Sequence, residues 1–394
     1  MTAVLSWAST LLAVSILFII GALFVLQAAR VLEDLWLAWR TPAWEEQVMN
    51  LLFAAEPSPE FVRRMSRPWT RIVVQNILYK VAPNLDGASK EKCAWLFEAM
   101  GSVDREIWRL RARSAFVRGR AAYRLGQMGS RRSIQPLIGT LEDSWVDVRY
   151  AAVLALGRLE AGEAVMLILT HAGGFEAYHR PAIVEVVKRL GLVDQKEARA
   201  YVVETMLVQS STFRLGVALA GALQLFEAIP KFWSRFESVS AETKMDIAKA
   251  VGTMGHPSAA KALAMFLNDP EPEVRRAILR ALGQLGEVSV IPWVIPKIKD
   301  PVWDVSEAAV QALAALDQSG ETLAGLLESD EEDMVKFKAA MQLEAMGVVD
   351  RWTEEVTTAS GEALHRVRQR LRLAVKYDAD QPIMKKLWHG PHVN

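Results

Sequence analysis

The stretch that decides the fold is EVRRAILRALGQLG, Glu273 to Gly286, which combines two adjacent arginines, an alanine-rich apolar run and two glycines. Taken alone, it has two interpretations. It is either a site where arginines and a Gly-x-x-Gly turn hold an anionic ligand, or one unit of a repeated structure. Its apolar residues recur at helical spacing, and its last glycine stands where a helix would stop. The choice depends on whether the pattern recurs elsewhere in the chain.

The same pattern recurs about every 31 residues. A leucine or methionine at the fourth position of each LGQLG-like element marks the period, and successive markers are 29 to 35 residues apart. The markers are Met128, Leu159, Leu190, Leu225, Met254, Leu285, Leu316 and Met346. The opening stretch therefore belongs to an internal repeat.

Two further columns run in phase with these markers. Ten or eleven residues before each marker stands a cation, with Ser306 as the exception: Arg118, Arg149, Arg180, Arg214, Lys244, Arg275 and Lys336. An aspartate precedes four positions of this column by six residues: Asp143, Asp269, Asp300 and Asp330. Repetition brings each aspartate near cations of adjacent units, so we expect an Asp–cation ladder that ties the turns together. Ligand binding by these columns is the alternative.

Each unit is predicted to consist of two helices. The upstream helix is apolar and often has an early proline, as in 133–143, whereas the downstream helix is rich in alanine, as in 148–159. Residues 103–349 are therefore predicted to form about eight α-hairpins, stacked as a right-handed all-α solenoid. The units between Gly191 and Ser240 lose the turn aspartate, so the sequence leaves their register open. The Gly-x-x-Gly elements follow helices, which makes them helix stops rather than phosphate cradles.

These residues resemble HEAT repeats, in particular the short subtype first associated with phycobilisome lyase proteins. The resemblance rests on the early proline, the turn aspartate, the following Val-Arg and the AxxALGxLG run, and it is strongest at 114–160 and 258–316. It implies an interaction scaffold more than an activity. Chromophore lyase or chromophore binding, known for this subtype, is one alternative function, for which the sequence offers Tyr178, His179 and scattered tryptophans. A signalling scaffold is another.

The N-terminal region contains no charged residue between positions 3 and 29. A helix of that length extends about 40 Å, enough for a hydrocarbon core of about 30 Å. We expect a retained transmembrane anchor, with a cleaved secretory signal as the alternative. Arg30 and Arg40 follow the span, which favours a single-pass inner-membrane protein with its N-terminus outside and its repeats in the cytoplasm. Trp7, Trp36, Trp39 and Trp44 are candidate interfacial anchors, or else part of a buried amphipathic helix under the first repeat.

Prolines and charge divide the rest of the chain. Residues 45–102 are helical in pattern but broken by four prolines, and residues 361–378 form an amphipathic basic helix. The predicted organisation is a transmembrane anchor and juxtamembrane helix at 1–44, a membrane-proximal cap at 45–102, HEAT-like repeats at 103–349, a C-terminal capping helix at 350–378 and a tail at 379–394.

Arginine is concentrated at the start of the repeats. Besides Arg118 of the ladder, the patch contains Arg105, Arg109, Arg111, Arg113, Arg120, Arg124, Arg131 and Arg132. We predict that it binds an acidic surface of a membrane partner or anionic lipid headgroups, with arginine stacking on Trp108 and Tyr123. A solvated basic face is the alternative. The acidic run at 327–333 is predicted to be a solvated turn.

Composition excludes several function classes. Of the 394 residues, 51% are hydrophobic, and 46 Lys+Arg balance 46 Asp+Glu, so no global field favours a nucleic-acid partner. The single cysteine, Cys93, cannot form an intramolecular disulfide and fits a reducing compartment. The six histidines form no HExxH motif, and Walker and GxSxG motifs are absent from the sequence. We therefore expect no metal, no cofactor and no enzymatic activity.

The overall layout is similar to HEAT-repeat proteins that accompany membrane glycosyltransferases of bacterial surface-polysaccharide (exopolysaccharide) systems. This similarity rests on one apolar span, a short cap and a basic first repeat. It implies an accessory subunit that docks a membrane partner. The transferase would catalyse the reaction, and this protein would have no catalytic activity of its own.

Overall fold

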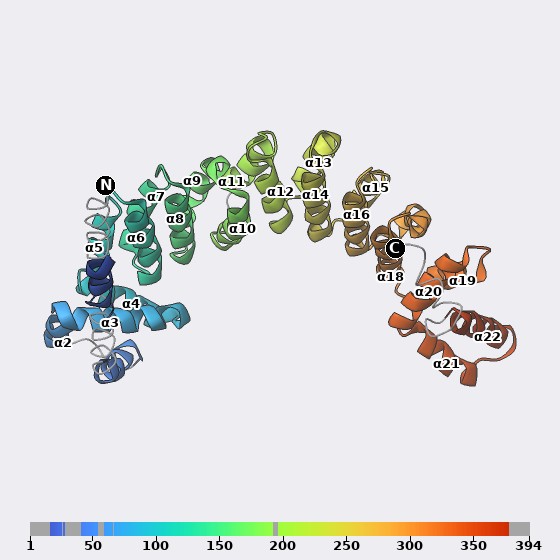
Figure 1. Cartoon of the computed structure of the whole chain (residues 1–394). Coiled ribbons are helices and arrows are strands. Elements are labelled where there is room, and N and C mark those ends of the chain that lie inside the picture. Colours follow the sequence, from blue (N-terminus) through green and yellow to red (C-terminus); the bar gives the residue numbers. More distant parts are fainter. Residues whose placement is uncertain are drawn as a thin grey trace, which may run out of the picture. The chain divides into compact units, whose positions relative to one another are not determined.

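The computed structural model describes residues 16–25, 27, 41–53, 59–65, 67–191 and 196–377. Every regular element in these ranges is a helix, and no strand occurs among them. The helices form two compact units, residues 1–171 and residues 172–394, and Figure 1 shows their order along the chain. The predicted all-α helical-repeat fold is therefore confirmed.

Unit 1 begins with helices that lie before the repeats: residues 41–53, α2 (Pro59–Met65), α3 (Pro68–Val81) and α4 (Gly87–Ala99). Two hairpins and a single helix follow: α5 (Ser102–Arg109) with α6 (Ala115–Met128), α7 (Ile134–Thr140) with α8 (Val146–Arg158), and then α9 (Val165–Thr170). The longer, downstream helices α6 and α8 pack side by side.

Unit 2 continues the same alternation of a short upstream helix and a longer downstream helix. Its helices are α10 (Arg180–Arg189), α11 (Lys196–Tyr201), α12 (Phe213–Ala222), α13 (Ile229–Arg235), α14 (Ala241–Met254), α15 (Ala259–Ala264), α16 (Pro272–Leu285), α17 (Ile291–Val294), α18 (Trp303–Leu316), α19 (Glu321–Glu328), α20 (Asp333–Ala345), α21 (Val348–Thr358) and α22 (Gly361–Lys376). A π-helical turn, Val202–Met206, extends α11, and a 3-10 helix, Ile295–Lys299, extends α17. Among the downstream helices, α12 packs on α14, α14 on α16 and α16 on α18.

The two glycines of the repeat motif have different roles. In α16, Gly283 faces Ala312 of α18, and a Cβ on this glycine would lie 3.3 Å from the Ala312 Cα. The contact is closer still at Gly126, where a Cβ would lie 2.6 Å from the Ala155 Cα. The first glycine therefore lets downstream helices approach closely. The second, as at Gly286 with φ of 68°, takes a left-handed conformation that ends the helix, as predicted.

The same glycine–alanine contact recurs at a constant separation and settles the register of the units. The pairs are Gly126 with Ala155, Gly221 with Ala250, Gly252 with Ala281 and Gly283 with Ala312. In each pair the alanine follows the glycine by 29 residues. Gly221 is thus equivalent to the motif glycines of the other repeats, although the sequence around it departs from the repeat pattern.

The predicted membrane span is not supported. Of residues 3–29, only 16–25 and 27 are described, and the rest lie outside the described residues, as do Trp36 and Trp39. No helix in the described part of the chain is both long and apolar enough to cross a membrane. The prediction of a single-pass inner-membrane protein with cytoplasmic repeats is therefore wrong.

Trp44 is a core residue and not an interfacial anchor. Its side chain is 8% exposed, and its ring lies 5.7 Å from the ring of Phe61 in α2. The Arg64 guanidinium lies over the Trp44 ring, 5.4 Å from the ring centroid. The helix at 41–53 is thus held by ordinary packing against α2.

The C-terminal helix α22 is fastened to α19 by one arginine. Arg370 donates to both carboxylate oxygens of Glu321 at 2.9 and 2.8 Å and to Glu328 at 2.8 Å. Its guanidinium also lies over the Trp352 ring of α21. The basic helix predicted at 361–378 therefore packs against the last hairpin, whereas the predicted tail at 379–394 lies outside the described residues.

Candidate docking surface

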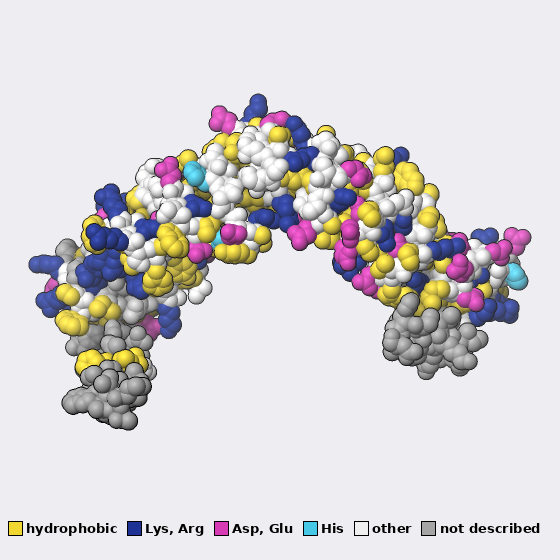
Figure 2. Space-filling model, turned by 45° about the horizontal axis from the view of Figure 1, so that its top comes forward, with side chains coloured by type: hydrophobic (Ala, Val, Ile, Leu, Met, Phe, Trp, Pro, Cys, Tyr) yellow, Lys and Arg dark blue, Asp and Glu magenta, His cyan; other side chains and the backbone are white. Residues whose placement is uncertain are grey.

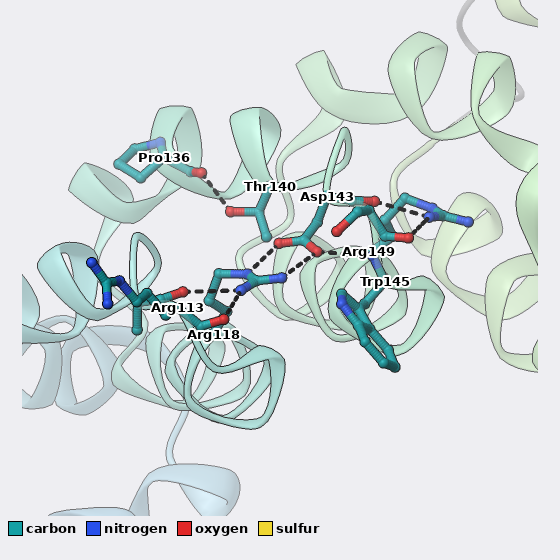
Figure 3. A network of polar contacts seen from close by, with 9 residues as sticks. Arg113, Arg118, Pro136, Thr140, Asp143, Trp145 and Arg149 are labelled. Atoms are coloured by element: carbon teal, nitrogen blue, oxygen red, sulfur yellow. Dashed lines mark hydrogen bonds and ion pairs between the residues drawn. The ribbon is translucent and has the colours of Figure 1, made fainter.

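The ladder arginine Arg118 joins two successive turns (Figure 3). Its Nε and Nη2 donate to the two carboxylate oxygens of Asp143 at 2.6 and 2.9 Å. Its Nη1 donates to the carbonyl oxygens of Ala112 and Arg113, in its own turn, at 2.9 and 3.0 Å. Asp143 also accepts the N–H of Trp145 at 2.9 Å, which orients the start of α8. One side chain therefore holds its own turn and the next.

Arg275, from the opening stretch, repeats this arrangement in unit 2. Its Nε and Nη2 donate to Asp300 at 2.8 Å each, and its Nη1 donates to the Asp269 carbonyl at 2.8 Å. Lys244 makes the carboxylate contact alone, to Asp269 at 2.7 Å. In all three cases the cation binds the aspartate that follows it by 25 residues, in the next unit. Because these three carboxylates are largely removed from solvent and already bound by cations, Asp143, Asp269 and Asp300 hold successive units together.

The other ladder positions depart from this scheme where the carboxylate is missing. Arg149 donates to the Asp143 carbonyl at 2.9 Å, but Gly174 stands 25 residues later. Ser306 donates to the Ile298 carbonyl, and Lys338 donates to Ser306 in turn. Three predicted members of the ladder form no ion pair among the described residues: Arg180, Lys336 and Asp330.

Arg214 lies one residue past the ladder position, which corrects its assignment. Ladder cations precede the helix-packing glycine by eight residues, as Arg118 precedes Gly126, and Phe213 occupies this place before Gly221. Arg214 instead donates to Glu242 and Asp246 of α14 at 2.7 and 2.8 Å. Its counterpart in α16 is Arg276, which donates to Asp304 at 2.9 Å. The separation in sequence is 28 residues in this bond and in the bond from Arg214 to Glu242.

The ladder cation that this unit lacks is replaced by an arginine from α13, the upstream helix of the next unit. Arg235 of α13 lies over the Phe213 ring at 4.5 Å and donates to the Val208 carbonyl at 2.8 Å. The turn before α12 is therefore also held by a guanidinium, although the arginine comes from a different helix.

Ion pairing changes the pKa of the ladder carboxylates. The hydrogen bond from Arg118 lowers the pKa of Asp143 below its ordinary value, and the Trp145 N–H adds to the effect. At Asp300, burial acts to raise the pKa, but the bonds from Arg275 and the Val302 N–H outweigh it and the pKa is lowered. Both carboxylates therefore stay ionised in the folded chain near neutral pH.

Several arginines of the predicted patch are tied to acidic partners. Glu106 is buried in α5 and accepts from Arg109 at 2.7 Å and from Arg124 of α6 at 3.2 Å. Arg132 pairs with Asp104 at 2.8 Å. At Arg105, partial burial and then the neighbouring Arg71 and Arg109 lower the pKa. Arg124 and Arg132 therefore connect α5 with α6 and with the residues after it.

The remaining arginines of this region surround the turn between α5 and α6. Arg111, Arg113 and Arg120 are exposed and form no ion pair among the described residues. Two aromatic side chains lie at the same turn, with Trp108 73% exposed and Phe116 74% exposed. Phe116 and Arg120 are four residues apart in α6 and therefore share a helix face, while Trp108 near the end of α5 is three residues before Arg111 of the turn. We call these five residues the α5–α6 surface.

The surroundings of this surface are hollowed. A cavity of about 390 Å³ within unit 1 is lined by Arg111 of the turn and by Pro136, Thr140 and Asp143 of the next hairpin. Figure 2 shows lysine and arginine side chains gathered beside hydrophobic ones over this part of unit 1, and in Figure 3 the Arg113 guanidinium points away from the Arg118–Asp143 pair. Arg131 is also exposed, but it lies beyond the other end of α6.

Sequence reasoning identified the arginines but missed Phe116 and Trp145, which is 60% exposed at the start of α8. The available signal was an aromatic residue at the start of a downstream helix. In α14 and α16, which contain Lys244 and Arg275, the residues at this place are polar or charged. Tyr178 and His179 do not form a ligand cleft, since His179 is buried and its Nδ1 accepts the Glu176 N–H at 3.2 Å. No group of His, Cys, Asp and Glu in the described ranges could hold a metal ion.

Comparison with solved structures finds remote likenesses. Human deoxyhypusine hydroxylase in complex with glycerol is 19% identical, with 64% of this chain and 99% of that chain covered and a TM-score of 0.29. The complex of CpcE and CpcF of phycocyanin lyase from Nostoc sp. PCC7120 is 20% identical, with 61% and 93% covered and a TM-score of 0.30. A complex of Kap95p with RanGDP is 10% identical, with 84% and 54% covered and a TM-score of 0.48. No curated protein matches the sequence.

A family model gives the more specific result. The model for HEAT repeats matches residues 103–173, 229–314 and 262–344. These ranges contain the hairpins whose glycines, turn aspartates and cations recur in register. None of these comparisons points to membrane anchoring, a glycosyltransferase or polysaccharide production. Residues 103–173 and 229–344 are HEAT repeats, and the helical framework that they form is of the HEAT type.

Proposed function

We propose that this protein is a non-enzymatic docking scaffold that binds an acidic region of a partner protein through the α5–α6 surface. The observation that carries the proposal is the combination at this surface of two rings almost three-quarters exposed with three arginines that form no ion pair among the described residues. Elsewhere in the same unit, Trp44 is buried and Arg118 is fully engaged.

This combination has the chemistry of a protein interface. Tryptophan and arginine are enriched among the residues that dominate binding energy, and aromatic rings contribute a large contact area with few rotatable bonds. Covering an exposed apolar ring gains about 25 cal/mol per Å² of area removed from water. Arg111 and Arg113 are available without breaking an internal pair, so a carboxylate on the partner gains their full charge complementarity. Stacked helical repeats present such surfaces on a rigid support.

The test is affinity capture with the full chain from the source cells, followed by mass spectrometry. Two variants remove the two parts of the surface: Trp108→Ala with Phe116→Ala, and Arg111→Glu with Arg113→Glu and Arg120→Glu. We expect each variant to lose the partner that the wild type retains, with far-ultraviolet circular dichroism unchanged. Raising the salt concentration should weaken capture by the wild type, because exposed charges are screened beyond about 10 Å at 0.1 M salt.

Matched controls lie elsewhere on the chain. Trp69→Ala removes a ring that is 71% exposed in α3, and Arg280→Glu reverses an exposed charge on α16. Both controls should capture the partner like the wild type. Retention of the partner by the two surface variants would contradict the proposal.

The class of partner is open to the same measurement. The layout similarity described above implies a glycosyltransferase of a surface-polysaccharide system as the partner. Recovery of such an enzyme with the wild type and its loss with the surface variants would support that identity. Recovery of a different acidic protein with the same variant dependence would keep the docking role and reject the glycosyltransferase.

A further inference from the structure

Unit 2 contains a groove over the downstream helices α10, α12 and α14 that lies apart from the α5–α6 surface. Its volume is about 490 Å³, within the range of roughly 300–1,000 Å³ typical of ligand sites. Ala218, Gly221 and Ala222 of α12 form its floor together with Ala250 of α14, which meets Gly221 backbone to backbone. Figure 1 shows the three helices in succession.

The groove exists because α12 lacks the side chains that cover the equivalent surface in other repeats. Relative to the helix-packing glycine, positions −3 and +1 are occupied by Tyr123 and Gln127 in α6, by Lys249 and Thr253 in α14 and by Arg280 and Gln284 in α16. In α12 both positions are alanine, Ala218 and Ala222. In α16 the Gln284 side chain covers the equivalent surface. Its Oε1 lies 2.4 Å from the place that a Cβ on Gly252 of α14 would take.

Cations stand on both sides of this apolar floor. Arg180 of α10 lines one wall and Lys249 of α14 lines the other, and neither forms an ion pair among the described residues. Arg214 and Asp246 also line the groove, and they pair with each other, while Glu242 binds Arg214 as well. A molecule in the groove therefore meets small apolar side chains below and two unbalanced positive charges at the rim.

We propose that this groove binds an extended, acidic peptide segment of a partner protein, with small apolar side chains on the alanine floor and carboxylates at Arg180 and Lys249. An extended chain points alternate side chains to opposite sides, so a sequence that alternates alanine and glutamate places both kinds where the groove accepts them. The narrow floor admits alanine-sized residues, and the opposed cations select negative charge.

The experiment measures binding of a fluorescein-labelled peptide of alternating glutamate and alanine to the full chain by fluorescence anisotropy. A peptide in which glutamine replaces every glutamate is the matched probe. We expect the wild type to bind the glutamate peptide at least about tenfold more tightly than the glutamine peptide. Absence of binding, or equal affinity for both peptides, would overturn the proposal.

Variants separate groove filling from loss of charge. Ala222→Gln introduces the residue that α6 and α16 already have at this position, so the fold should tolerate it while the floor is blocked. Arg180→Gln with Lys249→Gln removes the rim charges. Each should weaken binding of the glutamate peptide about tenfold or more. Arg280→Gln, on α16, should leave it unchanged, and unchanged binding by Ala222→Gln would contradict the assignment of the site.

The groove is also tested independently of the docking function. The triple variant Arg111→Glu, Arg113→Glu and Arg120→Glu should bind the glutamate peptide like the wild type. If it loses the peptide, the peptide binds at the α5–α6 surface and the groove proposal fails, whereas the docking proposal stands or falls by its own capture experiment.

Discussion

The guanidinium of Arg118 binds both its own turn and the next one, which a lysine at the same position does only in part. Its planar group has five donors, enough to hold two carbonyls of its own turn and both oxygens of Asp143. Lys244 donates one side-chain hydrogen bond in the equivalent place, to Asp269. The repeat therefore accepts either cation, but arginine joins adjacent units more completely.

Replacing Asp143 with asparagine tests this link. We expect the free energy of unfolding at neutral pH to fall by about 2 kcal/mol, because Arg118 loses a largely buried carboxylate. The Asp143 pKa lies below its ordinary value, so the stabilisation is present above about pH 3.9 and is lost as the pH falls through the lowered pKa. Urea denaturation of both proteins across acidic pH should show the difference shrinking, and a difference that does not change with pH would refute the role of this ion pair.

The single thiol provides a second test at the residue scale. Cys93 of α4 is 3% exposed, and burial raises its pKa to about 12. Because the thiolate is the reactive form, maleimide labelling at mildly alkaline pH should be at least about 100-fold slower in the native protein than in urea. Rapid labelling of the native protein would show that α4 does not pack as described.

At the scale of the helix, the glycines of the repeat motif are not interchangeable with other glycines. Gly126 lies in a contact where a Cβ would approach Ala155 to 2.6 Å, whereas nothing lies within 4 Å of a Cβ on Gly139 in α7. We expect Gly126→Ala to destabilise the chain by about 1–3 kcal/mol and Gly139→Ala to stabilise it by about 0.5–1 kcal/mol. Thermal unfolding should move in opposite directions for the two variants, and a similar shift for both would contradict the packing.

Most of the helical framework was predictable, because apolar spacing and helix-ending glycines are local signals. The partner of each ladder cation was not, since the aspartate six residues before it and the one 25 residues after it are equally plausible by spacing. The one-residue error at Arg214 arose because this unit lacks a turn aspartate and its apolar face is continuous; only the contact of Gly221 with Ala250 defines the register. The predicted membrane span was wrong, because no helix in the described part of the chain is both long and apolar enough to cross a membrane.

The candidate surface was predictable in residue type more than in extent. Counting arginines located the region, but it did not distinguish Arg109 and Arg124, which bind Glu106, from Arg111 and Arg113, which bind no acid among the described residues. Which arginines remain available depends on how α5 lies against α6, and that is a property of tertiary packing.

At the scale of the whole molecule, the helical repeats support two candidate binding surfaces. Unit 1 presents rings and unpaired arginines at the α5–α6 surface, and unit 2 presents a cationic groove over α10, α12 and α14. In the ladder, Arg118 with Asp143 and Arg275 with Asp300 form internal ion pairs. Substitutions at the two surfaces are therefore expected to change binding and to leave the free energy of unfolding unaltered. Substitutions in the ladder are expected to change the free energy of unfolding.

The most direct test of the docking role is site-specific photo-crosslinking in the source cells. A photo-reactive phenylalanine analogue is placed at Phe116 or, as a control, at Trp69, which is equally exposed in α3. We expect one dominant cross-linked protein from position 116, none of it from position 69, and its loss when Arg111 and Arg113 are changed to glutamate. Cross-linking of the same protein from both positions, or its persistence after the charge reversal, would contradict docking at the α5–α6 surface.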